Sequence, residues 1–262
     1  MIDRETEIAF NTQVAADTYV MGFKAPEIVA AASPGQFVMI RVGSALEPLL
    51  RRPFSIGGTL QGELLLILYK VIGKGTALMA KAEKGDHMAV LGPLGRGFSQ
   101  PRPGKRPILA AGGIGIAPLL FLAQTLAVSK PLFLAGYRRE AEKVPFDTFG
   151  LTDENLLIAT DDGSLGHHGF VTELLETHIH QAEKASAIVY ACGPAPMLKK
   201  VAALTISSQT SCQMSLEANM ACGLGACQGC AVKSSTPDRI TYYLVCKDGP
   251  IFPARAIDWE TL

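Results

Sequence analysis

The chain has 262 residues, of which 48% are hydrophobic and 18% are charged, a composition typical of a folded protein. Its 24 Lys and Arg residues balance 24 Asp and Glu residues. This balanced net charge gives no electrostatic reason to expect binding to a nucleic acid or to an anionic membrane. The charged start, MIDRETEIAF, has no apolar run, which argues against a secretory signal and predicts a cytoplasmic protein with reduced thiols.

Residues 1–101 carry short apolar runs separated by turn signals. FVMIRV at 37–42 and ELLLILYKV at 63–71 have the length of strands, and Pro-Gly and Gly-Gly pairs lie between such runs. This spacing is typical of a small antiparallel β-barrel. The proline-rich stretch PRPGKRP at 101–107 then predicts a joint between two domains.

Beyond that joint the pattern becomes βαβ. The strand-like runs ILAA, PLFLAGY, NLLIAT and AIVYACG alternate with helical stretches, which predicts a parallel sheet. Residues 107–129 lack charge, but glycines and a proline interrupt them, so a strand, a turn and a buried helix explain them better than a membrane span. We expect a barrel at 1–101, an α/β domain at 102–210 and a cysteine-rich domain at 211–262.

A glycine turn follows the first strand of the α/β half. LAAGGIGIAPLL places Gly113, Gly115 and Pro118 in a G-x-G-x-x-P arrangement. Such a turn lets the backbone approach a diphosphate, and the helix that follows offers free N–H groups. Proline is tolerated in the first helical turn because no N–H is needed there. A tight strand-to-helix turn without a ligand remains the alternative.

Two other strand ends should reach the same edge of the sheet. Cys192, Gly193 and Pro194 close one strand, and Asp161 follows another in ATDDGSLG. Because ligands of open α/β sheets bind beyond the carboxyl ends of strands, three such turns favour a nucleotide site. Taken singly, Cys192 also fits an ordinary buried cysteine, and the aspartates fit turn chemistry.

The barrel half holds a second candidate phosphate site, in LLRRPFSIGG at 49–58. Arg52 has the planar fork that clamps a diphosphate, and Ser55 lies three residues further on. Gly75 and Thr76 open a predicted helix after a strand, which offers another helix N-terminus. The alternative interpretation is a surface arginine pair and a capped helix, which explain the same residues without a ligand.

These motifs, in this order, resemble the ferredoxin-NADP reductase superfamily. The resemblance implies an FAD-binding barrel beside a nicotinamide-nucleotide domain, with Arg52 on the FAD diphosphate and Ser55 facing the flavin N5. Phe54 stands where many relatives have tyrosine. The implied FAD residues are Arg52, Pro53, Phe54, Ser55, Leu68, Tyr69, Lys70, Gly75 and Thr76, and the implied NAD residues are Gly113, Gly115, Pro118, Asp161, Cys192, Gly193 and Pro194.

Four of the six cysteines are concentrated near the C-terminus. Cys222, Cys227, Cys230 and Cys246 have the spacing C-x4-C-x2-C-x15-C, and plant-type ferredoxins also begin C-x4-C-x2-C. The glycines between them let the backbone curl around a cluster. The pattern favours a [2Fe–2S] cluster over zinc, which more often uses two C-x2-C pairs, and over disulfides. Cys192 and Cys212 are not expected to be ligands.

SLEANMACGLGACQGCAVK and VCKDGPIF closely resemble the electron-transfer subunits of NAD-dependent, B-type dihydroorotate dehydrogenases. The resemblance implies one FAD and one [2Fe–2S] cluster per chain, with NAD as an exchangeable substrate. It also implies a separate FMN-containing subunit that oxidises dihydroorotate in pyrimidine biosynthesis, in a heterotetramer of two plus two. Electrons would pass from FMN through the cluster and FAD to NAD, so no side chain of this chain is assigned as catalytic.

Met220, Leu224 and Ala226 flank the cluster cysteines and are candidates for the docking face. Rival interpretations are a subunit of a sulfhydrogenase or of an NAD(P)H:ferredoxin oxidoreductase, and a zinc-stabilised nucleotide-binding regulator. The nucleotide choice stays open from the residues alone, because Arg138 and Arg139 suit either a 2′-phosphate or a solvated pair.

Overall fold

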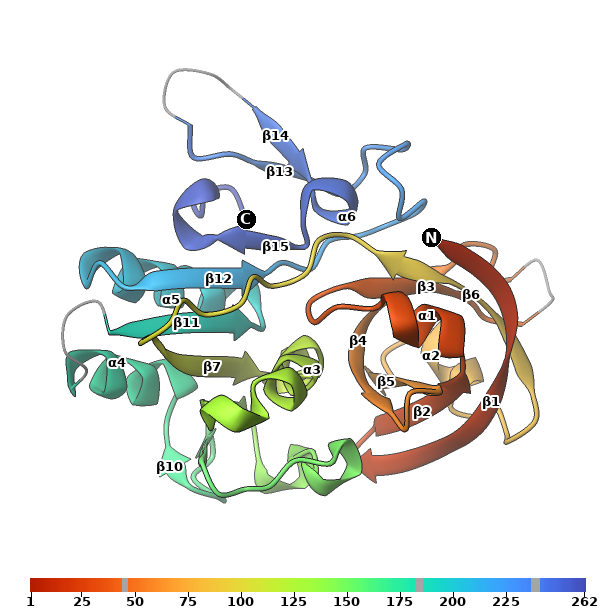
Figure 1. Ribbon diagram of the computed structural model, residues 1–262, viewed down its shortest axis with the longest axis horizontal. Coiled ribbons are helices and arrows are strands. Elements are labelled where there is room, and N and C mark those ends of the chain that lie inside the picture. The colour runs from red at the N-terminus through yellow and green to blue at the C-terminus, as the bar shows by residue number, and fades with distance from the viewer. Residues whose placement is uncertain (44–46, 182–185, 237–240) are drawn as a thin grey trace.

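The computed structural model describes residues 1–43, 47–181, 186–236 and 241–262. Within these residues, antiparallel strands close a barrel in the order β1-β2-β5-β4-β3-β6 (Figure 1). The strands are β1 (Ile2–Ala15), β2 (Thr18–Lys24), β3 (Phe37–Arg41), β4 (Arg52–Leu60), β5 (Leu64–Lys70) and β6 (His87–Leu94). Two short helices, α1 (Pro26–Ala31) and α2 (Lys74–Met79), lie between them in the chain. The predicted antiparallel barrel is confirmed.

Strand β5 is buried on both faces, which explains its continuous apolar run. Leu65 and Ile67 point into the barrel core, together with Tyr69. Leu66 and Leu68 point the other way and join the core that the barrel shares with helix α3 (Ile116–Thr125). The period-2 alternation of a strand therefore directs one set of side chains to the barrel interior and the other to the junction with the α/β part.

The second sheet has the order β10-β9-β8-β7-β11-β12-β15. Strands β7 (Arg106–Gly112), β8 (Leu132–Tyr137), β9 (Leu156–Thr160), β10 (His167–His168), β11 (Ala187–Cys192) and β12 (Ser211–Ser215) pair in parallel, and β15 (Ile251–Pro253) is antiparallel to β12. The predicted parallel sheet is confirmed. The uncharged stretch 107–129 forms β7, η1 (Gly113–Gly115), α3 and η2 (Ala127–Ser129).

Helices cover both faces of this sheet. Alternate residues of β7 divide between them, because Ile108 packs with α4 (Val171–Gln181) and α5 (Ala195–Ser207), whereas Leu109 packs with α3. In the described part of the chain, no helix is both long and apolar enough to cross a membrane.

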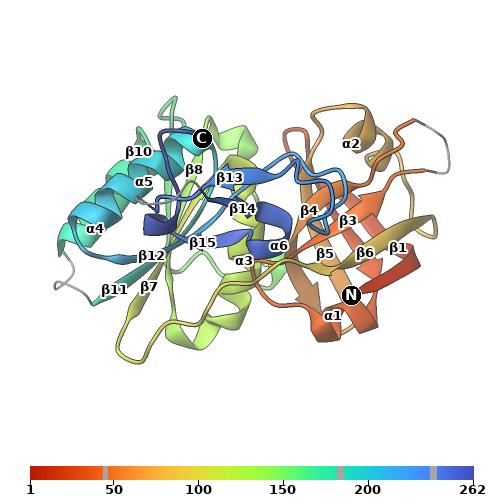
Figure 2. The same cartoon turned by 90° about the horizontal axis from the view of Figure 1, so that it is seen from above.

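The cysteine-rich segment leaves the sheet after β12 and returns to it at β15. It carries β13 (Ala231–Lys233), β14 (Tyr242–Leu244) and α6 (Val245–Asp248), and η5 (Ala254–Ala256) follows β15. Figure 2 shows this blue segment along the junction of the barrel and the sheet. The three-domain division stays a proposal. Since residues 211–215 pair with β11, the pairing favours a last boundary after Ser215 rather than after residue 210.

Candidate cofactor sites

Arg52 lies over the first turn of α2. A Cβ atom built on Gly75 would be 2.9 Å from the Arg52 Nε atom, so only glycine allows this approach. The Arg52 Nη1 atom also donates a hydrogen bond to the Leu50 carbonyl. The hydroxyl of Thr76 accepts hydrogen bonds from the backbone N–H groups of Ile72 and Gly73, at 3.0 and 3.2 Å. The two predicted phosphate-binding motifs of the barrel half are therefore brought together.

The remaining barrel residues of the predicted FAD set differ in exposure. The Tyr69 ring is buried, packs edge-to-face on Phe54 at 6.2 Å between ring centroids, and donates a 2.9 Å hydrogen bond to Asn11 Oδ1. Burial raises the pKa of Tyr69 above its usual value. Leu68 is buried as well, so Leu68 and Tyr69 are the least exposed of these remaining residues. Ser55 stays partly exposed on β4.

Lys70 ends β5 and connects the barrel to the α/β part. Its Nζ atom lies 3.2 Å from Glu142 Oε1, and Arg138 Nη2 lies 3.0 Å from the same oxygen. Glu142 belongs to η3 (Glu140–Glu142), directly after β8. Although burial opposes it, hydrogen bonds from Lys70 and then Arg138 lower the pKa of Glu142. Arg138, one of the two arginines considered for a 2′-phosphate, therefore already has a carboxylate partner.

At the carboxyl edge of the sheet, the glycine turn after β7 contacts the end of β11. A Cβ on Gly115 would lie 2.7 Å from the carbonyl carbon and oxygen of Cys192 and from the Cα atom of Gly193. Gly113 has φ +53°, a left-handed conformation that glycine adopts easily. Pro118 is buried as the third residue of α3, where its missing N–H leaves no helical bond unmade. Gly115, Cys192 and Gly193 of the predicted set therefore come together.

Asp161 stands apart from this contact. It follows β9, and β8 lies between β9 and β7 in the sheet. Its backbone N–H donates to the Tyr137 carbonyl at 3.1 Å, and its side chain is exposed. The residue shares the edge with the glycine turn but does not touch it.

Glu217 and Ser215 are residues of this edge that sequence reasoning missed. Burial, and after it the charge of Glu217, raises the pKa of the Cys192 thiol, and the Ser215 hydroxyl hydrogen-bonds to that thiol. The side chain of Glu217 reaches solvent but lies in a recess, where desolvation raises the pKa of its carboxyl. Sequence reasoning could have found Glu217 from its position just beyond the carboxyl end of a strand, where ligands of such sheets bind.

The sulfur atoms of the C-terminal cysteines form two pairs. Cys230 Sγ lies 3.3 Å from Cys246 Sγ, and both side chains are buried. Cys222 and Cys227 form the outer pair, with Cys227 exposed. In the part of the chain that the structure describes, no three metal-binding side chains surround a single point. Because each iron of a [2Fe–2S] cluster takes two protein ligands, two pairs fit that cluster better than a single tetrahedral ion.

Backbone N–H groups point at these sulfurs. Those of Leu224 and Cys227 donate to Cys222 Sγ at 3.4 and 3.5 Å, and that of Gly225 donates to Cys246 Sγ at 3.1 Å. The hydrogen bonds from Cys227 and Leu224 lower the pKa of Cys222 to about 6. Inward N–H groups stabilise thiolates, the form that binds iron. The donor set therefore suits an iron–sulfur cluster.

The cysteine loop packs directly against the barrel. A Cβ on Gly223, which has φ +71°, would lie 2.6 Å from Met39 Cγ on β3 and 3.4 Å from Leu94 Cδ1 on β6. Just after α6, the carbonyl of Gly249 accepts a hydrogen bond from the backbone N–H of Arg96 at 2.6 Å. These contacts bring the loop to the same barrel whose β4 and α2 carry Arg52 and Gly75.

The barrel, the nucleotide-type sheet and the thiol loop define a reductase of the ferredoxin-reductase class. The structure of an NADH-dependent reduced ferredoxin-NADP oxidoreductase is similar, with a TM-score of 0.84, 28% identity, and coverage of 97% of this chain and 90% of that one. A ferredoxin NADP+ reductase from Neisseria gonorrhoeae has the same fold, at 19% identity and a TM-score of 0.64, over 79% and 91% of the two chains.

The relatives narrow this class to one family. Residues 217–258 match the iron–sulfur cluster binding domain of dihydroorotate dehydrogenase B. The chain is 42% identical to the dihydroorotate dehydrogenase B (NAD(+)) electron transfer subunit of Desulforamulus reducens, over 94% of this chain and 95% of that one. The corresponding subunit of Caldanaerobacter subterraneus is 37% identical over 97% of both. The chain belongs to the family of dihydroorotate dehydrogenase B electron transfer subunits.

Proposed function

We propose that this chain is the electron-transfer subunit of an NAD-dependent dihydroorotate dehydrogenase, with one FAD, one [2Fe–2S] cluster and NAD as an exchangeable substrate. Membership of the family supports the proposal. The single observation that carries it is the paired cysteine loop seated on the barrel, with its N–H groups directed at the sulfurs. A flavin exchanges hydride with a nicotinamide and single electrons with an iron–sulfur cluster, which joins the two chemistries in one chain.

Arg52 supplies the charge for the FAD diphosphate, since its fork already lies over Gly75 at the start of α2. Lys70, at the end of β5, ties this barrel edge to the α/β part through Glu142. The proposed FAD contacts are Arg52, Pro53, Phe54, Ser55, Leu68, Tyr69, Lys70, Gly75 and Thr76.

For NAD, the contact of Gly115 with Cys192 and Gly193 shapes the edge on which a diphosphate would lie. The ion pair of Arg138 with Glu142 supports NAD over NADP, because the guanidinium is already neutralised and the carboxylate would repel a 2′-phosphate. The proposed NAD contacts are Gly113, Gly115, Pro118, Asp161, Cys192, Gly193 and Pro194.

The proposed cluster ligands are Cys222, Cys227, Cys230 and Cys246. The buried pair, Cys230 and Cys246, holds the inner side, and the more exposed pair leaves the outer side accessible to a partner. Their need for free thiolates supports a cytoplasmic location.

The partner would be an FMN-containing, dihydroorotate-oxidising subunit in an assembly of two plus two. The name that the relatives carry, electron transfer subunit, supports a catalytic partner. Leu224 supports a docking face at the outer cysteine pair, since its side chain is 46% exposed in the middle of the loop. Met220 and Ala226 flank it and complete the proposed face.

The test uses the complex purified without oxygen from its own source. Dihydroorotate and NAD are added, and NADH formation is followed at 340 nm. We expect NADH to appear, and to disappear when this chain is removed and the partner is assayed alone. A sample that contains flavin and iron but forms no NADH would contradict the dihydroorotate assignment. It would favour a ferredoxin-type oxidoreductase, which the similarity to the structure described above makes the second candidate.

Gly115→Val is expected to disturb the nucleotide edge and to destabilise the chain. The new Cβ would meet the Cys192 carbonyl at 2.7 Å, and backbone atoms on both sides leave little room to relax. Overpacking of this kind typically costs about 1–3 kcal/mol, or roughly 2–10 °C in Tm for a chain of this size. Thermal unfolding measures the stability loss, and NADH-dependent dye reduction should show KM for NADH raised about tenfold or more.

Gly104→Ala is the matched control. Gly104 has φ +80°, but nothing lies within 4 Å of its Cβ position, so it carries backbone strain without a collision. The control should lose only about 1 kcal/mol and keep its KM for NADH. An unchanged KM in Gly115→Val would argue against a nucleotide at this edge.

Leu224→Glu is expected to weaken assembly with the catalytic subunit while the FAD spectrum is retained. A charged side chain in the centre of an apolar contact must be desolvated without a partner, which typically costs several kcal/mol. Size-exclusion chromatography of the co-expressed subunits measures the assembly. Val128→Glu is the control, because Val128 is 99% exposed and lies in η2, away from the cysteine loop. Equal assembly of the two variants would count against this docking face.

A further inference from the structure

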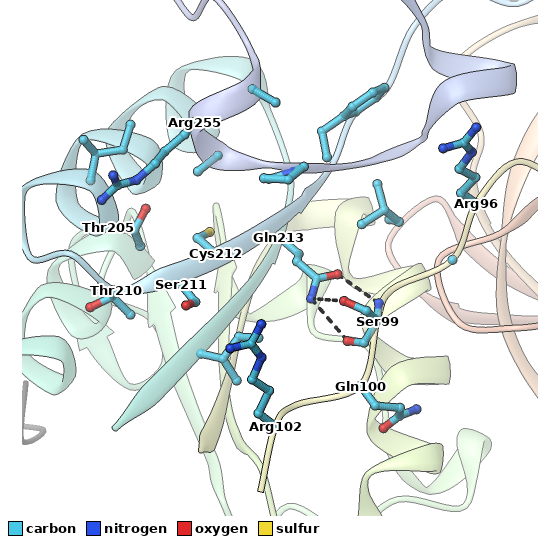
Figure 3. Close-up of a pocket in the computed structure, with 18 of the residues that line it drawn as sticks. Arg96, Ser99, Gln100, Arg102, Thr205, Thr210, Ser211, Cys212, Gln213 and Arg255 are labelled. Atoms are coloured by element: carbon cyan, nitrogen blue, oxygen red, sulfur yellow. Dashed lines mark hydrogen bonds between the residues drawn. The ribbon is translucent and has the colours of Figure 1, made fainter. Parts of the chain in front are cut away.

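A cavity of about 870 Å³, whose described lining includes no residue of the glycine turn, lies beside β12 (Figure 3). It is bounded by the linker between β6 and β7, by the amino ends of β11 and β12 at Ile188 and Ser211, and by β15 and η5. The candidate nucleotide edge lies at the carboxyl ends of the same strands. The cavity is therefore a separate site, and its volume falls within the range of small-molecule pockets, roughly 300–1,000 Å³.

Arginines line this cavity from different segments. Arg96 and Arg102 come from the linker, and Arg255 comes from η5. Among the described residues, none of these three guanidinium groups forms an ion pair or a side-chain hydrogen bond. Asp248 is the acidic residue of the described lining, and its Oδ2 atom already accepts a 2.8 Å hydrogen bond from the Leu244 N–H. The cavity therefore concentrates positive charge in a chain whose formal net charge is zero.

The linker that carries Arg96 and Arg102 is fixed in place. Gln213 on β12 accepts from the Ser99 N–H at 2.9 Å and donates to the Ser99 hydroxyl at 2.7 Å, as Figure 3 shows. The Tyr190 hydroxyl donates to the Ser99 carbonyl at 3.0 Å. Because Ser99 lies three residues from either arginine, these bonds fix the linker backbone between the two arginines before any ligand arrives, which lowers the entropy lost on binding.

An apolar wall lies beside the arginines. Ile188 and Ile251 line it, and Phe252 is braced by the Tyr243 ring at 5.3 Å between centroids. The hydroxyls of Thr210 and Ser211 border the same cavity. A ligand that fits this lining carries several negative charges at one end and a flat, partly apolar group at the other.

We propose that this cavity binds a nucleoside triphosphate. The phosphates contact the guanidinium groups of Arg102 and Arg255, with Arg96 at the barrel side, and the base lies along the apolar wall. Arginine suits this role because its planar fork forms paired, charge-assisted hydrogen bonds with phosphate oxygens. The cations are confined to a cavity instead of following a stripe, which favours a small ligand over a nucleic acid.

The test measures equilibrium binding to the assembled complex with its cofactors, at about 0.15 M salt to suppress weak surface binding. Saturating NAD is present so that the candidate nucleotide edge is occupied. ATP and UTP are the probes, and tripolyphosphate tests the phosphate chain alone. The variants are Arg102→Gln and Arg255→Gln, singly and together. Arg41→Gln is the matched control, because Arg41 is an exposed arginine on β3 outside the cavity.

We expect ATP or UTP to bind alongside NAD, and the double variant to weaken that binding about tenfold or more. Arg41→Gln should leave the affinity unchanged. Because Arg102 and Arg255 serve no internal ion pair in the described chain, their variants should fold, and retained FAD absorbance checks this. The proposal is overturned if no probe binds, if the double variant binds normally, or if tripolyphosphate binds as tightly as the nucleotides. Binding to the isolated chain but not to the complex would also overturn it, since the partner would then cover the cavity.

Discussion

Cys227→Ser is expected to remove the iron from the protein and to stop electron flow between the partner subunit and NAD. Serine is a poor ligand for iron. Loss of a residue that only supports a metal ligand lowers metal affinity about 10–100-fold, so loss of a ligand itself should lower it further. Cys227 is exposed, so the substitution disturbs no packing. Iron analysis and the visible spectrum measure the loss. NADH-dependent dye reduction should persist, because the proposed FAD and NAD contacts lie elsewhere.

The control for this variant is Cys212→Ala. Cys212 is the second residue of β12, ten residues before Cys222, and burial raises the pKa of its thiol to about 12. It is therefore a protonated core cysteine, and its removal should leave the iron content unchanged. Iron retained in Cys227→Ser, or lost in Cys212→Ala, would contradict the assignment of the ligands.

Arg52→Gln is expected to release FAD while the chain stays folded. Two charge-assisted hydrogen bonds to a diphosphate, together worth about 2 kcal/mol or more, correspond to at least a roughly 30-fold loss of affinity. The side chain is partly exposed and its internal hydrogen bond is to Leu50, near the surface, so little stability depends on it. Flavin content after gel filtration and titration of the apoprotein with FAD measure the change.

The neighbouring arginine supplies the control. Arg51 forms a two-pronged ion pair with Asp3, at 2.9 and 3.0 Å, and so is already occupied by a carboxylate. Arg51→Gln should lose only the small free energy of a surface ion pair, about 1 kcal/mol or less, and should keep its FAD. Equal flavin loss in both variants would indicate a general disturbance of the start of β4 instead of a diphosphate clamp.

Much of the fold follows from local pattern. Short runs with turn signals predict the barrel strands, and the alternation of apolar runs with helical stretches predicts the parallel sheet, because each pattern acts over a few residues. The sequence pattern did not predict strand β12. Its sequence, SCQMS, is short and half polar, and it becomes a strand because β11 and β15 pair with it on either side. Such pairing is decided by neighbours distant in the chain.

The same distinction runs through the candidate sites. The types of ligand, namely four thiols, an arginine fork and two glycine turns, are local and readable, since each chemistry requires particular side chains at close spacing. The contacts of Lys70 with Glu142 and of Gly223 with Met39, and the effect of the Glu217 charge on Cys192, cannot be predicted from the sequence. Each joins residues that only the packing of barrel, sheet and loop brings together.

The sequence by itself determined which groups this protein offers to cofactors, because side-chain chemistry and short-range backbone geometry are written within a few residues. Only the tertiary structure decided that the cysteine loop rests on the barrel beside Met39 and Leu94, and that three arginines from two segments surround one cavity. The physical reason is that burial of apolar surface, which is not directional, selects the arrangement of the parts as a whole. Distances between remote residues then follow from that arrangement.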